Sequence, residues 1–287
     1  MIEPKKYGDR AYTNTRTDAQ WQPSSFKQTD IQSDYVAAYL LSHGFKAEQT
    51  VGILSEGKSS WVTCEHGVIK AKMISVPLSI KLTPEEIAFR INHSEAVALA
   101  VSANTLGNAI KALPLFDHHV MFIYLDEQDD RLENQIRLAG WKQDVDYVPY
   151  QTMLMDGEAL LAKKPNLVKD VEATISEQDT INICYTSGTT GNPKGIMLTH
   201  VNYWVNSHDA IELFQLPDAQ FETLVVLPVD HSFAHTVGIY TSLLRGITLH
   251  FVDSRGSNAA IIRNFPKNLV ELNPVFLMTV PSITGNF

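Results

Sequence analysis

Long apolar runs without polar alternation are the feature that most limits what this chain can fold into. The clearest cover residues 96–102 and 120–126, and the apolar-rich segments 51–55, 73–78, 181–187, 223–228, 247–253 and 275–280 also suit strands. A strand that is apolar on both faces is typical of a parallel sheet covered by helices on each side. We therefore predict eight strands at these positions and an α/β fold.

Helix signals lie between the runs. Residues 29–43 carry apolar side chains at helical spacing, and Gly44 follows where a helix often ends. Another helix is predicted to begin at Thr83. Thr83 suits the N-cap, Pro84 the first helical position, and Glu86 completes a capping box. The alternation of strand and helix signals supports stacked, mostly parallel sheets flanked by helices.

The order of segments predicts two α/β subdomains, residues 1–175 and 176–287. The polar opening stretch, to about residue 26, is predicted to be an extended arm over the surface. Residues 149–178 are predicted to be a loop-rich connection. The acidic residues between 126 and 130 are predicted to form a solvated loop, as most charge runs do.

Composition narrows the function classes. Hydrophobic residues make up 44% of the 287 and charged residues 19%, which is globular composition. The net charge of -9 disfavours a nucleic acid as the main partner, because such a partner requires a basic face. The two cysteines, Cys64 and Cys184, favour neither a disulfide framework nor a zinc cluster.

The cellular location is predicted from two sequence signals that the chain lacks. No apolar run is long enough to cross a bilayer, and the first residues lack the apolar core of a secretory signal. A cytoplasmic protein is therefore the expectation. Peripheral membrane association and a homodimer both remain open.

The segment with the most chemical information follows the run 181–187. Four hydroxyls and two glycines fall within six residues, Thr186, Ser187, Gly188, Thr189, Thr190 and Gly191. Glycine lets backbone N–H groups converge on an anion, and hydroxyls can turn donors toward phosphate oxygens. Lys194 comes shortly after, behind Pro193, and can bring a point charge to a polyphosphate. The segment is predicted to be a phosphate-binding loop rather than an ordinary turn.

Known phosphate and nucleophile motifs do not fit this loop. The Walker A pattern fails because Asn192 and Pro193 follow Gly191. The dinucleotide pattern fails because Gly188 has no glycine two residues away, and the nucleophile elbow fails because Tyr185 stands where a glycine is needed. An ordinary phosphate-loop hydrolase is therefore disfavoured.

From Tyr185 to His200 the chain reads YTSGTTGNPKGIMLTH, which resembles the signature loop of the adenylate-forming (AMP-binding) superfamily. That superfamily includes acyl-CoA ligases, peptide-synthetase adenylation domains and luciferases. The resemblance continues through VGILSEGKSSWV and ISVPLSIKLTPEEIAFRINHSEA upstream, and through LPVDHSFAHTVGIYTSLLRG and PVFLMTVPSITGNF downstream. It implies the large amino-terminal domain of the acyl-CoA ligase type fold, here incomplete.

The resemblance implies ATP, Mg²⁺ and coenzyme A as cofactor and co-substrates. A carboxylate would be activated to an acyl-adenylate and then transferred to the coenzyme A thiol. Residues 186–191 with Lys194 would bind the β- and γ-phosphates, and Thr186 would lie near the metal. His231 would stand beside the carboxylate and the α-phosphate, and Phe233 would help to wall the acyl pocket. The catalytic residues implied are therefore His231, Lys194 and Thr186.

The phrase LP-x-x-H-x-F around His231 is closer to fatty acyl-CoA ligases, so a fatty acid is the expected substrate. An aryl or amino acid is the alternative. In amino-acid-activating members of the superfamily an aspartate near this block pairs with the substrate's ammonium, and here His231 occupies the corresponding place with Asp230 adjacent. His231 and His235 have zinc-ligand spacing, but Ser232 replaces the glutamate of the metalloprotease motif.

The later blocks of the superfamily have no counterpart here. The Y-G-x-T-E segment, the ribose-binding aspartate and the small carboxy-terminal domain with its lysine are not found. The chain is therefore expected to be an amino-terminal piece with little or no turnover of its own. A non-catalytic module that binds a nucleotide or a partner is the competing reading.

Overall fold

The structure is a computed structural model, and it describes residues 6–17, 20–186, 193–213, 220–255, 257 and 259–279. Contacts group the chain into two compact units. The hairpin unit comprises residues 31–55 and 63–200, and the π-helix unit comprises residues 1–30, 56–62 and 201–287. Both units are discontinuous in sequence, whereas the division at residue 175 follows chain order. That division stays a prediction.

The hairpin unit contains a seven-stranded sheet. Its strands are β3 (Thr50–Leu54), β4 (Ile74–Leu78), β5 (Ala98–Val101), β6 (Met121–Tyr124), β7 (Tyr147–Pro149), β8 (Thr180–Thr186) and β9 (Lys194–Thr199). Their order across the sheet is β7-β6-β5-β3-β4-β8-β9. Neighbours are parallel except β8 and β9, which are antiparallel. A mixed α/β fold with a mostly parallel sheet is thereby confirmed.

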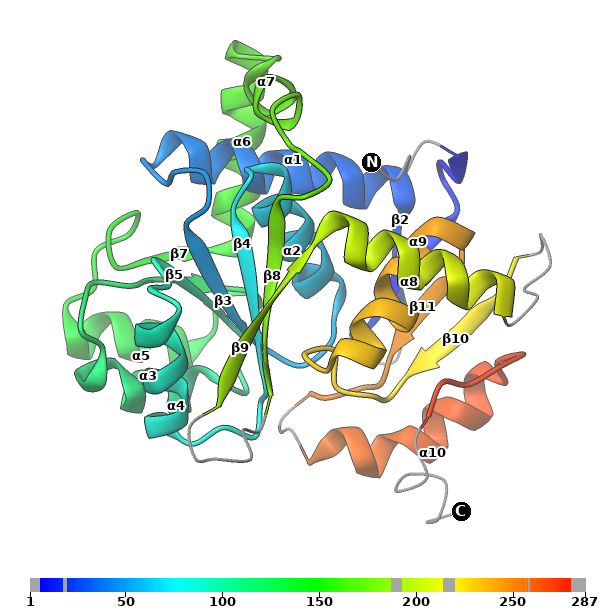
Figure 1. Cartoon of the computed structure of the whole chain (residues 1–287). Coiled ribbons are helices and arrows are strands. Elements are labelled where there is room, and N and C mark those ends of the chain that lie inside the picture. Colours follow the sequence, from blue (N-terminus) through cyan, green and yellow to red (C-terminus); the bar gives the residue numbers. More distant parts are fainter. Residues whose placement is uncertain are drawn as a thin grey trace. The chain divides into compact units, whose positions relative to one another are not determined.

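Helices cover both faces of this sheet (Figure 1). The helices of this unit are α1 (Phe26–Ser42), α2 (Ser59–Lys70), α3 (Pro84–His93), α4 (Leu106–Ala112) with the 3₁₀ turn η2 (Leu113–Leu115), α5 (Asp130–Ala139), α6 (Tyr150–Lys163) and α7 (Leu167–Glu172). The first residues of α1 and α2, 26–30 and 59–62, belong to the π-helix unit. Helices α3, α4 and α5 pack on one face through a cluster that includes Ile91, Leu99 and Phe122. Every residue of β3, β4, β5 and β6 is buried, which is why these strands read as continuous apolar runs.

The local signals for helix ends are confirmed. The Thr83 hydroxyl accepts from the backbone N–H of Glu86, and the Glu86 carboxylate accepts from the N–H of Thr83, which completes the capping box. Gly44 adopts a φ of 84° beyond α1, a conformation that glycine takes without strain.

The predicted loop over residues 149–178 is wrong. Helices α6 and α7 occupy most of it. Helix α6 lacks a side-chain N-cap bond, so its start carried no sequence signal. Its Gly157 lies against α1, where an added Cβ would come within 2.0 Å of the Tyr35 carbonyl oxygen. A glycine that weakens the helix pattern is therefore needed for the close approach of the two helices.

The π-helix unit contains a four-stranded sheet of β1 (Ala11–Thr17), β2 (Gln20–Ser25), β10 (Glu222–Val225) and β11 (Thr248–Phe251), in the order β10-β11-β1-β2. β1 is parallel to β11 and antiparallel to β2. The predicted surface arm is therefore wrong. The segment is extended, but β1 is an inner strand, and Tyr12 on it is fully buried with its hydroxyl donating to the Ile239 carbonyl at 3.1 Å.

The helices of this unit are α8 (His200–Leu213), which starts one residue earlier in the hairpin unit, the π-helix η3 (Ala234–Tyr240), α9 (Thr241–Arg245) and α10 (Ala260–Leu272). A small core joins β10 and α10 through Leu224 and Phe265. The strand predicted over 275–280 does not form in its described part, residues 275–279. Phe276 instead accepts one hydrogen bond on its carbonyl from the Thr223 hydroxyl at 3.2 Å, and Val275 is exposed.

The acidic stretch is more than a solvated loop. Asp129 caps α5 by accepting from the N–H of Leu132 at 3.1 Å, and Asp130 belongs to the helix. Asp126 accepts from the N–H of Ala103 at 2.7 Å. Carboxylates are favourable at a helix N-terminus, which explains why acidic residues gather there.

Candidate functional site

The predicted phosphate loop connects two antiparallel strands. β8 ends at Thr186 and β9 begins at Lys194, and these two residues are Cα partners in the register. Directly opposed residues of an antiparallel pair project from the same face, with Cβ atoms about 5 Å apart. Both side chains are exposed. The Thr186 and Lys194 side chains therefore project from the same face at the loop end of the hairpin.

The other residues predicted for the loop lie outside the described residues: Ser187, Gly188, Thr189, Thr190 and Gly191. The predicted return to helix near residue 199 is confirmed by α8. β9 was missed, because its short run KGIMLT has no alternation and half of its residues are exposed.

The base of the loop is anchored to α3. The Tyr185 hydroxyl shares a hydrogen bond of 2.8 Å with His93 Nδ1, and the Arg90 guanidinium lies 5.5 Å from the centre of its ring. Burial raises the pKa of Tyr185. Gly195 lies opposite Tyr185, and an added Cβ there would come within 2.9 Å of Ile183 Cγ2. The glycine after Lys194 thus makes room for the side chains of β8.

His231 lies in the π-helix unit, ahead of η3. Its Nδ1 accepts from the backbone N–H of Phe233 at 3.3 Å. In the neutral imidazole one ring nitrogen accepts and the other carries the proton. The neutral ring therefore has its N–H at Nε2, and because the side chain is exposed this N–H is available as a donor.

Phe233 is 41% exposed, which is high for a large aromatic side chain. The two histidines that suggested zinc occupy different environments. His231 is exposed, whereas His235 is fully buried on η3, between Trp61 at 5.5 Å and Tyr203 at 5.3 Å. His235 is a residue of the aromatic core, so the zinc reading has no support.

A second phosphate-loop pattern, not noticed in the sequence, runs from Gly52 to Ser59. GILSEGKS fits G-x-x-x-x-G-K-S and joins a strand to a helix, as a Walker A loop does. The structure rules this site out. Gly52 is an inner residue of β3, paired on both sides. Lys58 is buried and bonded to Glu56 at 2.9 Å.

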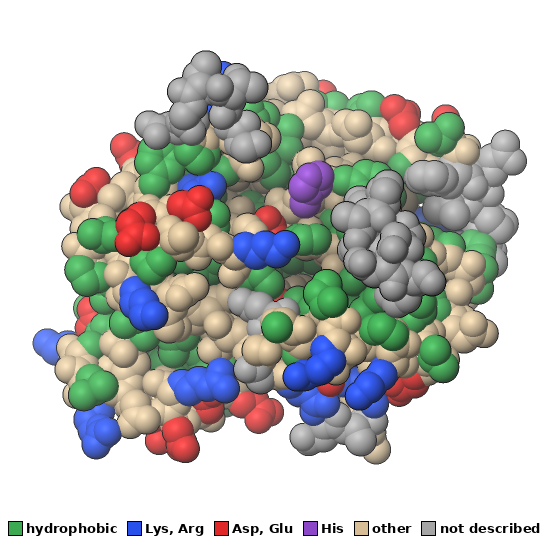
Figure 2. Space-filling view, turned by 90° about the horizontal axis from the view of Figure 1, so that it is seen from below, with side chains coloured by type: hydrophobic (Ala, Val, Ile, Leu, Met, Phe, Trp, Pro, Cys, Tyr) green, Lys and Arg blue, Asp and Glu red, His purple; other side chains and the backbone are tan. Residues whose placement is uncertain are grey.

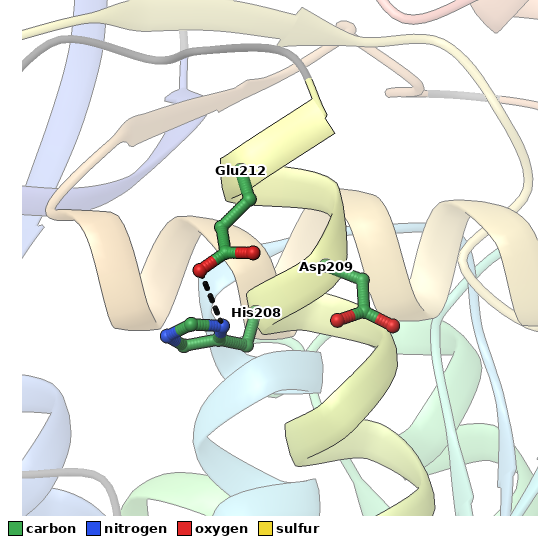
Figure 3. A group of neighbouring side chains, drawn as sticks. All are labelled: His208, Asp209 and Glu212. Carbon is green, nitrogen blue, oxygen red and sulfur yellow. Dashed lines mark ion pairs between the residues drawn. The ribbon is translucent and has the colours of Figure 1, made fainter.

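One group of side chains among the described residues is close enough to hold a metal ion. Ligand atoms of His208, Asp209 and Glu212 lie within 4.8 Å of one another on α8. All three side chains are exposed, and His208 pairs with Glu212 at 3.6 Å. Figure 3 shows Asp209 extending from another side of the helix. The group is best described as a surface ion pair with a neighbouring carboxylate.

Figure 2 shows one face on which basic, acidic and hydrophobic side chains are interspersed. Among the described residues, no helix combines the length and the apolar character needed to cross a bilayer.

Comparison with known proteins gives a consistent result. The family model described as AMP-binding enzyme matches residues 3–286. Long-chain-fatty-acid–CoA ligase 5 of Mus musculus is 30% identical over 270 residues, covering 90% of this chain and 36% of the mouse protein. The peroxisomal long chain acyl-CoA synthetase 7 of Arabidopsis thaliana is 26% identical, covering 84% of this chain and 34% of that protein. The chain thus spans about a third of the length of these relatives.

Solved structures share the fold at lower identity. The adenylation domain of a carboxylate reductase from Mycobacterium chelonae superposes with a TM-score of 0.77 at 15% identity, over 97% of this chain and 44% of that one. A fatty acyl-adenylate ligase from L. pneumophila, solved with acyl adenylate and pyrophosphate, gives 0.67 at 17% identity, over 94% and 41%. With the match of the family model over nearly its whole length, the chain belongs to the AMP-binding enzymes.

Proposed function

We propose that this chain is the part of a fatty acid–CoA ligase that binds ATP and the acyl group. In the first step a carboxylate oxygen attacks the α-phosphorus of ATP, forming a carboxylate–phosphate anhydride while pyrophosphate leaves. In the second step the thiolate of coenzyme A attacks the acyl carbonyl and AMP leaves. Both steps are displacements in which positioning and charge stabilisation carry the catalysis, so no protein nucleophile is required.

The observation that carries the proposal is the pairing of Thr186 with Lys194 across the hairpin. Lys194 offers three N–H donors and a positive charge to the β- and γ-phosphates, and Thr186 offers a rotating hydroxyl. A hydroxyl oxygen is also a ligand type that Mg²⁺ accepts, and the metal would neutralise phosphate charge there. Ser187, Gly188, Thr189, Thr190 and Gly191 would complete the loop.

His231 is proposed to donate from Nε2 to the reacting carboxylate or to an oxygen of the α-phosphate. The bond from Phe233 N–H to Nδ1 supports this role, because it leaves Nε2 as the protonated nitrogen. Phe233, with its exposed ring, is proposed to contact the acyl group. No described residue is assigned to coenzyme A.

A fatty acid is favoured because the relatives are named as long-chain ligases. The mouse protein is a long-chain-fatty-acid–CoA ligase and the Arabidopsis protein a long chain acyl-CoA synthetase. The expected low turnover of the chain alone, and its cytoplasmic location, stay predictions. Pyrophosphate exchange into ATP with oleate tests the former directly, and sustained exchange by the 287-residue chain would contradict it.

The proposal is tested by calorimetric titration of the chain with MgATP. Lys194→Ala should weaken binding at least about tenfold, a loss of roughly 1.4 kcal/mol, because a charge-assisted phosphate contact is removed. Lys111→Ala, at an exposed lysine on α4, is the matched control and should bind as the unmodified chain does. Identical titrations for all three proteins, or no binding by any, would contradict the proposed function.

A further inference from the structure

The loop-bearing hairpin joins the rest of its sheet beside β4. β8 runs parallel to β4, with Ser75 opposite Asn182 in the register. β9 stands at the end of the strand order and pairs with β8. Whatever fixes β8 against β4 therefore also fixes the hairpin that carries Thr186 and Lys194.

A buried carboxylate on α2 bridges these two strands. Glu65 Oε1 accepts from the Ser75 hydroxyl at 2.9 Å and from the Asn182 side-chain amide at 3.3 Å. Glu65, Ser75 and Asn182 are all fully buried. Burying a carboxylate is costly unless hydrogen bonds compensate, so a glutamate at this place in a helix that faces an apolar sheet requires a specific reason.

The hydrogen bond from Asn182 to Glu65 lies on the face of β8 that also carries Thr186. Successive residues of a strand point to opposite faces, so Asn182, Cys184 and Thr186 share one face. The side-chain amide oxygen Oδ1 of Asn182 also accepts from the Cys184 thiol at 2.9 Å, which extends the contact toward the loop. A slip of one residue would turn Thr186 to the other face, so holding Asn182 fixes the direction of Thr186.

We propose that Glu65 is a positioning residue for Thr186 and Lys194, the two described strand residues that flank the phosphate loop. Through Ser75 and Asn182 it holds β8 in register with β4, so that Thr186 and Lys194 project together from the face that meets ATP. The inference rests on the proposed function where it is tested by the affinity for MgATP. Where it is tested by amide hydrogen exchange in β8 and β9, it rests on the fold alone.

Three variants of the 287-residue chain separate positioning from general stability. Glu65→Ala removes the acceptor, whereas Glu65→Gln keeps an amide oxygen that can accept the same two bonds. Leu99→Ala, at a fully buried leucine on β5, is the matched control, because it destabilises the core of the same unit without touching β8. Each variant is titrated with MgATP and analysed by backbone hydrogen exchange without nucleotide.

The expected result is specific to the acceptor. Glu65→Ala should weaken MgATP binding about tenfold and speed amide exchange in β8 and β9 more than in β5 and β6. Glu65→Gln should restore both to within about threefold, and Leu99→Ala should leave the affinity within about twofold despite lower stability. If Glu65→Gln behaves like Glu65→Ala, or if Leu99→Ala weakens binding as much, the positioning role is excluded.

The two proposals fail in different ways. If the unmodified chain binds no MgATP, the proposed function fails, and hydrogen exchange alone then decides the positioning role. If the unmodified chain binds MgATP and Glu65→Ala binds it equally well with an unchanged exchange pattern, the positioning role fails while the proposed function stands.

Discussion

Thr186 and Lys194 are opposed residues of one antiparallel strand pair, the last of β8 and the first of β9. The signature loop therefore closes a hairpin, and Thr186 and Lys194, the two described residues proposed to bind phosphate, start from a paired backbone geometry. Pre-ordered donors lose less entropy when an anion binds than donors on a free loop do. Hydrogen bonds from two helices fix strand β8 of this hairpin: α3 bonds Tyr185 through His93, and α2 bonds Asn182 through Glu65.

His231 should matter for binding and not for folding. We expect His231→Ala to weaken binding of a non-hydrolysable fatty acyl-adenylate analogue about tenfold, because one neutral or charge-assisted hydrogen bond is lost. The free energy of unfolding should change by less than about 1 kcal/mol, since the side chain is exposed. Calorimetry and denaturant unfolding measure the two quantities. His119→Ala, at an exposed histidine of the hairpin unit, is the control, and equal affinities for both variants would contradict the assigned role.

Gly157 should be intolerant of any side chain. Gly157→Ala places a Cβ within 2.0 Å of the Tyr35 carbonyl oxygen, so α1 and α6 must separate. Overpacking of this kind costs about 1–3 kcal/mol, which exceeds the gain of about 1 kcal/mol in helix propensity. Urea unfolding should show a clear loss of stability. Gly107→Ala on α4, where nothing lies near the added Cβ, should instead be neutral or stabilising. A stabilised Gly157→Ala would show that the two helices do not approach as described.

Stability should fall as the pH is lowered through the range of histidine titration. Burial lowers the pKa of His250 below its ordinary 6.5, although the Glu222 carboxylate at 2.9 Å opposes the shift. The unfolded chain therefore takes up a proton near pH 6.5, before the folded chain does. This contribution to stability is complete above pH 6.5 and is lost as the pH falls toward the lower, folded pKa.

His250→Gln should flatten the dependence of unfolding free energy on pH between about 7.5 and 5.5, by at most about 1.4 kcal/mol per pH unit. Burial also lowers the pKa of His200, so part of the slope should remain. Denaturant unfolding at a series of pH values measures the slopes. A slope in His250→Gln equal to that of the unmodified chain would contradict the assigned environment.

The sequence predicted the inner strands β3 to β6 and helix α3 because their signals were local. Continuous apolar runs identified β3 to β6, and the Thr83 capping box identified the start of α3. α6 was missed because Gly157 breaks its pattern and serves a contact with a residue far away in the chain. The polar β1 and β2 lack the apolar pattern of a strand, and β1 is an inner strand only through its pairing with β11, which is far away in the chain.

The candidate site was predictable where several polar and charged residues stand close together in the sequence. Hydroxyls, glycines and Lys194 within one stretch identified the loop, but nothing in the sequence indicated that Thr186 and Lys194 are opposed strand residues. Glu65 was not found, because a single glutamate on an apolar helix becomes informative only when its partners Ser75 and Asn182 are known.

The central claim is that the Thr186–Lys194 hairpin holds the triphosphate of ATP, and a crystal structure of the chain with a magnesium-bound, non-hydrolysable ATP analogue tests it most directly. Lys194 Nζ and Thr186 Oγ1 are expected within about 3 Å of phosphate oxygens. A nucleotide bound elsewhere, with the hairpin loop closed and its amides directed inward, would contradict it.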